Sequence, residues 1–173
     1  MAAYKGSNVS DPHWRATVGS PIGELGLVAT GKGLRAVLWR GEITSARLPE
    51  NMVEGAGHSV LQRAARQLAE YFASKRTSFD LPLDLRGTPF QVAVWRSLAA
   101  VPYGRTVSYS QQAAAIGRPT AVRAVGQANG RNPVPVVLPC HRVLGANGSL
   151  TGFGGGLDLK SELLRREGAL QAS

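Results

Sequence analysis

A lone cysteine followed directly by a histidine is the first candidate for chemistry in this chain. Cys140 is the only cysteine among 173 residues and stands in the segment VVLPCHRV, residues 136–143. Nearby positive charge lowers the pKa of a thiol, and a base such as His141 can take its proton, which gives a nucleophilic thiolate. The alternative is a small buried hydrophobe, the commonest role of a lone cysteine. The run before Pro139 is typical of a strand, and His141 can help Cys140 only if the chain turns there.

Glu167 is a candidate partner for the histidine. It lies near the end of a helix that a face of leucines predicts from Asp158 to Gly168. A carboxylate there could orient His141 as the third member of a nucleophile, base and orienter set, whereas the alternative is a solvated helix-end glutamate. The glycine-rich segment 152–156 could close over a ligand or form a plain surface loop.

Two capping boxes predict the helices that precede the cysteine. Thr88-Pro89-Phe90-Gln91 begins a helix that runs to about Ala100, and Ser108-Tyr109-Ser110-Gln111 begins a short alanine-rich helix that ends near Gly117. Arg118-Pro119 prevents continuation of the second helix. These elements belong to the second half of the chain.

A third helix is expected over residues 121–129, with Thr120 as its cap. Two short helices joined by a tight turn are typical of a helix-turn-helix, although any helical hairpin has this pattern. The third helix carries small residues, which suit either insertion into a narrow groove or close helix packing: Thr120, Ala121, Ala124, Gly126 and Ala128. Arg123 on this helix is a phosphate contact or a solvated charge.

The first half predicts a small antiparallel meander and one amphipathic helix. Strands are expected over 14–18, 24–29 and 34–39, a loop over 40–59 and a helix over 60–73. Segment 74–87 links the two halves. We therefore expect two domains, residues 1–80 and 81–173.

Composition limits the class of protein. With 43% hydrophobic and 18% charged residues the chain can bury a core, and the charge of +9 favours a polyanionic partner such as nucleic acid. No apolar run approaches the length of a membrane span, and the start lacks the order of a secretory signal, so a cytoplasmic location is expected. One cysteine and three histidines leave little for a structural zinc site, and we expect neither a metal nor a cofactor.

Taken together, residues 87–168 resemble the catalytic domain of the O6-alkylguanine-DNA alkyltransferases. The resemblance rests on GTPFQ at 87–91, VPYG at 101–104, SY at 108–109, RAVG at 123–126, NPVPVVLPCHRV at 132–143, GGL at 155–157 and EG at 167–168. Residues 14–73, including SPIG at 20–23, fit the family's ribonuclease H-like N-terminal domain. The implied fold is α/β (α+β): antiparallel strands with a helix, then a mostly helical domain with a helix-turn-helix.

The resemblance implies direct-reversal DNA repair, in which Cys140 takes the alkyl group from O6-alkylguanine in double-stranded DNA and reacts once. His141 would act through a water as the base and Glu167 would orient it. Asn132 would brace the turn, and Tyr109 would protonate guanine N3. Arg123 would enter the stack in place of the extruded nucleotide, and the backbone carbonyls of Cys140 and Val143 would contact the flipped guanine. The other residues that the resemblance places at the substrate or the DNA are Lys160, Phe153, Gly154, Thr120, Ala121 and Ala124.

Two departures and two alternatives accompany this resemblance. Phe153 stands where the family often has tyrosine, so we expect slower transfer, and the zinc site of some members cannot form with one cysteine. A lesion-recognition module without transfer is the first alternative, but such proteins lack the cysteine. A Cys–His hydrolase is the second. We expect minor-groove binding by a monomer, with cooperative assembly on DNA and activity on O4-alkylthymine left open.

Overall fold

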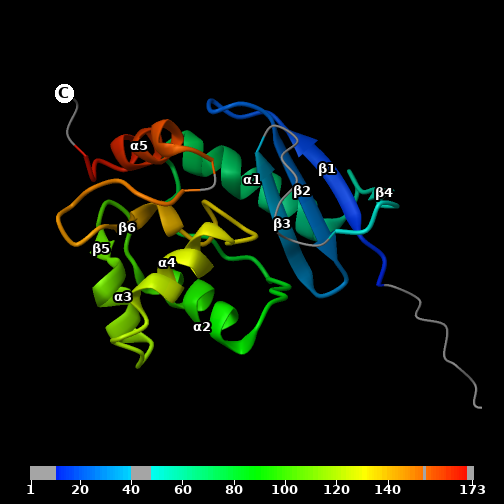
Figure 1. Cartoon of the computed structure of the whole chain (residues 1–173). Coiled ribbons are helices and arrows are strands. Elements are labelled where there is room, and N and C mark those ends of the chain that lie inside the picture. The colour runs from blue at the N-terminus through cyan, green and yellow to red at the C-terminus, as the bar shows by residue number, and fades with distance from the viewer. Residues whose placement is uncertain (1–10, 40–47, 154, 171–173) are drawn as a thin grey trace, which may run out of the picture.

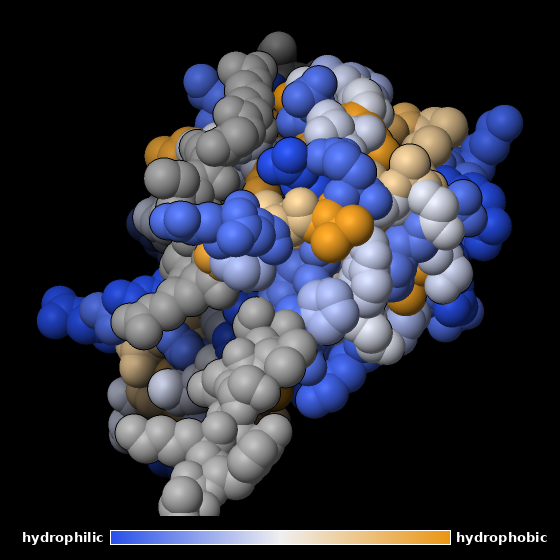
Figure 2. All heavy atoms as spheres, turned by 90° about the vertical axis from the view of Figure 1, so that its right-hand side faces the viewer, coloured by the Kyte–Doolittle hydropathy of each residue, from blue (hydrophilic) through white to orange (hydrophobic). Residues whose placement is uncertain are grey.

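The computed structural model describes residues 11–39, 48–153 and 155–170. A four-stranded sheet with one long helix packed beside it forms the N-terminal part, and short helices surround the segment that carries Cys140 (Figure 1). This arrangement confirms the expected mixed α/β class. The face of the molecule on the β4 side is mostly hydrophilic, with small and separate apolar areas (Figure 2).

The sheet has the strand order β3-β2-β1-β4. Its strands are β1 (Trp14–Val18), β2 (Leu25–Thr30), β3 (Gly33–Trp39) and β4 (Val53–Glu54). The first three strands form the expected antiparallel meander, with ends within one residue of the prediction. The short strand β4 pairs parallel to β1 inside the segment expected to be a loop. Two residues are too few to show a strand periodicity, and Val53 is 54% exposed.

Helix α1 (Ser59–Phe72) packs on the sheet, and its buried face includes Leu61 and Leu68.

The segment that links the two halves is held against the edge strand β3. The backbone N of Leu34 donates to the Pro82 carbonyl at 2.8 Å, and the N of Asp84 donates to the Leu34 carbonyl at 2.9 Å. Gly33 is required here because a Cβ at this position would overlap the Pro82 carbonyl.

The C-terminal part is mostly helical. Its elements are α2 (Pro89–Ser97), the 3-10 helix η1 (Leu98–Ala100), β5 (Val107–Ser108), α3 (Tyr109–Ala115), α4 (Val122–Gly130), the 3-10 helix η2 (Cys140–Arg142), β6 (Val143–Leu144) and α5 (Leu157–Arg166). Both predicted capping boxes are confirmed. The Thr88 hydroxyl accepts from the N of Gln91, and the Ser108 hydroxyl accepts from the N of Gln111, each at 3.1 Å.

Helix α4 begins differently from the prediction, because Thr120 does not cap it. Ala121 is the N-cap residue, and no side chain makes the capping hydrogen bond. The Ala121 N donates instead to the Arg118 carbonyl at 2.9 Å. Arg118 to Ala121 thus forms a turn with Pro119 in its second position, and the helix starts one residue later than expected.

The segment before Cys140 is a buried turn and not the expected strand. Val136 has φ of 70°, and the N of Leu138 donates to the Val134 carbonyl at 2.9 Å. Prolines at 133, 135 and 139 remove backbone donors, which prevents a regular ladder. The turn is fixed to the sheet because the Val37 N donates to the Pro133 carbonyl at 2.9 Å. Val136 holds this φ as a β-branched residue, so the turn stores backbone strain next to the cysteine.

Sheet, helices and turn share one buried cluster that runs from Leu27 through Leu68 and Val94 to Cys140. The expected boundary between residues 80 and 81 stays a prediction. Within the described ranges, no helix is long and apolar enough to cross a bilayer.

Candidate active site

The turn that the chemistry requires is present at Cys140. The chain enters the 3-10 helix η2 directly after Pro139, and the Arg142 N closes it on the Pro139 carbonyl at 3.0 Å. Asn132 braces this turn from the other side. Its Nδ2 donates to the Leu138 carbonyl at 2.8 Å, and its Oδ1 accepts from the Val134 N at 3.0 Å.

Cys140 is buried, with 6% of its surface exposed. Burial raises the pKa of its thiol to about 11, although the Asn132 side chain and the positive charge of Lys160 act in the opposite direction. Positive charge from Lys160 thus lowers this pKa as expected, but burial outweighs it and leaves the thiol less acidic than an ordinary cysteine. The nearest cation in sequence, Arg142, is committed to the Glu167 carboxylate. The resting thiol keeps its proton near neutral pH, so attack requires a base.

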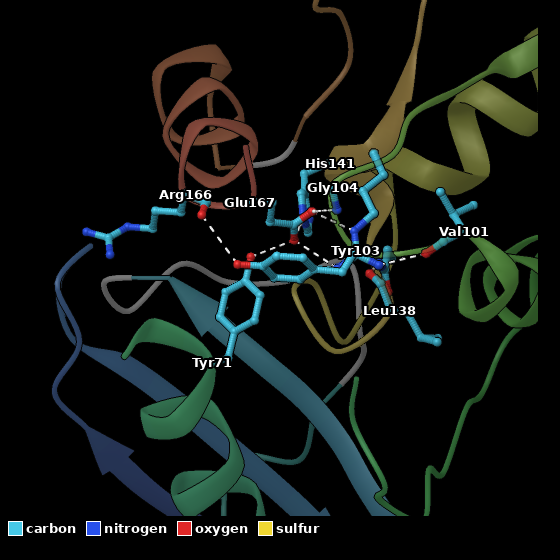
Figure 3. A network of polar contacts seen from close by, with 10 residues as sticks. Tyr71, Val101, Tyr103, Gly104, Leu138, His141, Arg166 and Glu167 are labelled. Carbon is cyan, nitrogen blue, oxygen red and sulfur yellow. Dashed lines mark hydrogen bonds and ion pairs between the residues drawn. The ribbon is translucent and has the colours of Figure 1, made fainter. Parts of the chain in front are cut away.

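His141, the next residue, has a ring nitrogen that is free to accept a proton. Its ring is fully buried, and Nε2 lies 2.7 Å from Oε1 of Glu167 (Figure 3). An ionised carboxylate only accepts, so Nε2 carries the proton and Nδ1 has the free lone pair. No described residue hydrogen-bonds Nδ1. Burial lowers the pKa of His141 in spite of the Glu167 charge, which keeps the ring neutral and able to accept a proton.

Glu167 is buried and not the solvated glutamate of the alternative interpretation. Its Oε1 accepts from the Tyr71 hydroxyl, His141 Nε2 and Arg142 Nη2 at 2.7, 2.7 and 2.9 Å. Its Oε2 accepts from Arg142 Nε at 2.8 Å and from the Gly104 N at 3.4 Å. The donors from His141 and Arg142 lower the carboxyl pKa to about 2 against the opposing effect of burial, so Glu167 stays ionised.

Lys160 and Tyr109 form another wall beside the cysteine. Lys160 is fully buried, and its Nζ donates to the carbonyls of Val143 and Thr151 at 2.6 and 2.8 Å. Burial lowers its pKa to about 8. The Tyr109 hydroxyl donates to the same Thr151 carbonyl at 2.9 Å, and burial raises the pKa of Tyr109. Both side chains therefore donate to the Thr151 carbonyl oxygen, which belongs to the loop after β6.

Phe153 belongs to this loop and packs edge-on against Trp39, with ring centroids 6.1 Å apart. A Cβ on Gly155 would lie 2.6 Å from Leu159 Cδ2 and 3.0 Å from Phe153 Cε1, so a larger residue there would require these side chains to shift. Gly154, the other loop residue implicated by the sequence, lies outside the described residues.

The helix-turn-helix is formed by α3 and α4. Thr120, Arg123 and Ala124 are exposed and Ala121 is half-buried, so α4 presents these residues at the surface. The helix-packing interpretation of the small residues applies to Ala128, which is buried and whose carbonyl accepts from Trp95 Nε1 at 2.7 Å. Insertion of the exposed small residues into a groove stays a prediction. Among the residues that the structure describes, no group of three or more His, Cys, Asp or Glu gathers to hold a metal ion.

Comparison with known families decides the relationship. The model for the 6-O-methylguanine DNA methyltransferase DNA-binding domain matches residues 89–169, and that for the ribonuclease-like domain of the same proteins matches residues 14–85. The chain belongs to the methylated-DNA–protein-cysteine methyltransferase family. Members named so include one from Mycolicibacterium paratuberculosis, 50% identical over 154 residues that cover 87% of this chain and 90% of that protein. A relative from Methanosarcina acetivorans is 45% identical over 150 residues, with 87% and 95% covered.

Solved structures of methyltransferases agree. The O6-methylguanine methyltransferase of Mycobacterium tuberculosis superposes with a TM-score of 0.81 at 42% identity, covering 93% of this chain and 96% of that one. The OGT of the same organism in complex with DNA also has a TM-score of 0.81, at 43% identity with 91% and 92% covered.

The structure brings Cys140, His141, Glu167 and Lys160 into one buried cluster, with the half-buried Asn132 beside it and Tyr109 at its wall. Two residues that donate to Glu167, Tyr71 and Arg142, also belong to this site, and neither was predicted from the sequence as a partner of the carboxylate. Arg142 stood beside the cysteine and could have been weighed as a partner for Glu167. Tyr71 could not, because it lies 96 residues from Glu167 on a helix of the other half.

Proposed function

We propose that this protein repairs DNA by moving the alkyl group of O6-alkylguanine irreversibly onto Cys140. The observation that carries the proposal is the buried Cys140 turn with a neutral His141 fixed by Glu167, in a chain of this methyltransferase family. The buried lone pair on His141 Nδ1 is the acceptor that a protonated thiol needs.

His141 Nδ1 takes the Sγ proton through a bridging water while Sγ forms a bond to the alkyl carbon. The bond between that carbon and guanine O6 breaks, and its electron pair remains on the base. Tyr109 gives a proton to guanine N3 and recovers one from solvent, and Glu167 stabilises the imidazolium until it loses its proton. Lys160 keeps the Thr151 carbonyl hydrogen-bonded when the Tyr109 hydroxyl turns to the base.

The carbonyls of Cys140 and Val143 would read the guanine amino group, and Phe153 would stack on the base. A base inside a duplex cannot reach a buried thiol, so the nucleotide must be flipped at a cost of roughly a few kcal/mol. Arg123 is exposed on α4 and offsets part of that cost by entering the stack. The small side chains of Thr120, Ala121 and Ala124 let α4 approach a minor groove closely.

The partner is double-stranded DNA, which the charge of +9 attracts without regard to sequence. We propose that the protein acts as a monomer in the cytoplasm. Cooperative assembly would appear as binding that steepens with duplex length. No metal and no cofactor takes part in the proposed steps.

A thioether has no easy route back to a thiol, so each molecule reacts once. The test is a titration in which a duplex carrying one O6-methylguanine is held in excess over the protein. The amount of repaired duplex should reach a plateau at one per protein molecule, and Cys140→Ala should give none. Continued turnover would point to a hydrolase, and lesion binding without product would point to a recognition module; either result would overturn the proposal.

A further inference from the structure

Tyr71 connects the N-terminal part to the proposed reaction. It lies near the end of α1 and is 3% exposed. Its hydroxyl donates to Oε1 of Glu167 at 2.7 Å, across the boundary between the two parts of the chain (Figure 3). None of the roles proposed above for the residues around Cys140 involves this hydrogen bond.

The bond falls on the oxygen that also holds the base. Oε1 accepts from Tyr71, from His141 Nε2 and from Arg142 Nη2. Donors on one oxygen share its electron density, so a third donor weakens the pull of the carboxylate on the His141 proton. Tyr71 therefore acts on the base without touching the substrate.

The Tyr71 side chain is held firmly and stays protonated. Its ring lies 5.1, 5.6 and 6.1 Å, centroid to centroid, from the rings of Phe72, Phe79 and Tyr103. Burial and the Glu167 charge raise the pKa of the phenol, so it remains a donor throughout the working range of pH. A rigid donor limits the rotamers open to Glu167.

We propose that Tyr71 is a positioning residue for alkyl transfer, which fixes Glu167 against His141 and limits its basicity so that His141 stays neutral with Nδ1 free. This inference rests on the proposed function, because it assigns the means by which the base is kept ready. The N-terminal part then contributes to the reaction as well as to the fold.

The expected sign follows from the groups around the pair. His141 also faces the charges of Arg142 and Lys160, which lower its pKa, and shares η2 with the Cys140 thiol. The Tyr71 phenol faces the pair from α1, and the Tyr103 phenol lies beside it on the turn after η1. Removing only the Tyr71 hydroxyl leaves these charges in place and makes the carboxylate more basic. The pKa of His141 then rises, so the ring stays protonated, and cannot act as a base, up to a higher pH than in the wild type.

The experiment compares Tyr71→Phe with Tyr103→Phe, which removes a neighbouring hydroxyl that donates to the Arg166 carbonyl at 3.3 Å and does not touch Glu167. Single-turnover methyl transfer is followed by intact mass as a function of pH, with thermal unfolding as a check on folding. A second readout is the rate at which iodoacetamide alkylates Cys140, the only thiol, without DNA.

Because Glu167 loses the hydrogen bond that fixes it against His141, we expect Tyr71→Phe to slow transfer about three- to tenfold near neutral pH. The acid limb of both profiles should move up by about half a pH unit, while Tyr103→Phe stays close to wild type. Incorporation of 3-fluorotyrosine at position 71, a stronger donor of nearly the same shape, should move the limb down and keeps the test open if Tyr71→Phe folds poorly. Unchanged limbs in the position-71 variants would overturn the inference. Wild-type protein that reacts with iodoacetamide but gains no methyl group would instead overturn the proposed function.

Discussion

Replacing Glu167 by glutamine should destabilise the protein far more than an ordinary loss of one charge. The change keeps the size of the side chain but removes the charge that Arg142 and His141 face. Arg142 has 7% of its side chain exposed, and both its Nε and its Nη2 donate to Glu167. Glutamine offers one acceptor oxygen and places an amide among donors, so the buried guanidinium loses its counter-charge.

The buried pair of Glu167 and Arg142 sets the size of this loss. Breaking a buried ion pair by removing one partner costs about 3–5 kcal/mol. The same contacts lower the Glu167 pKa from the ordinary value of 4.5 to about 2 in the folded protein. A depression of that size contributes about 3 kcal/mol. That stabilisation is fully present above the unfolded pKa and is lost as the pH falls through the folded pKa.

The assay is urea unfolding of wild type and Glu167→Gln between about pH 7 and pH 3. The control is Glu162→Gln, which removes an exposed carboxylate of α5 whose partner Arg166 lies at 2.9 Å. We expect the control to lose at most about 1 kcal/mol. Glu167→Gln should lose about 3–5 kcal/mol near neutral pH. The deficit should shrink toward pH 3, because there the unfolded wild-type chain binds a proton at Glu167 that the folded protein, with a pKa of about 2, does not. Equal losses in the two variants, or a deficit that does not shrink in acid, would refute this account of the carboxylate.

Three further substitutions test the surroundings of the thiol. Asn132→Ala removes the brace on the Leu138 carbonyl and should cost about 1–3 kcal/mol of unfolding free energy; a loss below that range in urea unfolding would argue against the brace. Arg123→Ala changes an exposed side chain, so stability should stay within about 0.5 kcal/mol while repair of duplex DNA slows; an unchanged repair rate would remove Arg123 from flipping. Phe153→Tyr adds a hydroxyl able to contact guanine O6, and single-turnover assays should show faster transfer, whereas equal rates would dispose of the idea.

Local chemistry made the helices of the second half predictable. Thr88 and Ser108 each precede a glutamine at the capping-box spacing, and both boxes formed because they need only residues within one turn. The prediction of Thr120 as an N-cap was wrong because Pro119 places the chain in a turn that ends at Ala121. The strand predicted before Cys140 was also wrong. Its valines favour a strand, but the prolines between them lack the backbone N–H groups that a sheet requires.

The site was predictable only where residues are near in sequence or matched a known family. Glu167 was equally consistent with a solvated helix end, and only tertiary packing shows that it is buried with Arg142. The raised pKa of Cys140 could not be anticipated, because burial outweighs the charges that the sequence places beside it. Tyr71 carries no sequence signal of its role, since nothing local distinguishes it from other aromatic residues of a helix face.

The most direct test of the central claim uses a duplex whose single O6-methylguanine carries a carbon-13 and deuterium label in the methyl group. After reaction, the protein is digested for peptide mapping and the DNA is digested to nucleosides. The account predicts one labelled methyl group per molecule, all of it on Cys140, together with unmodified guanine in place of the lesion. Label on another residue, label released as free methanol, or a lesion that survives while the protein is bound would contradict it.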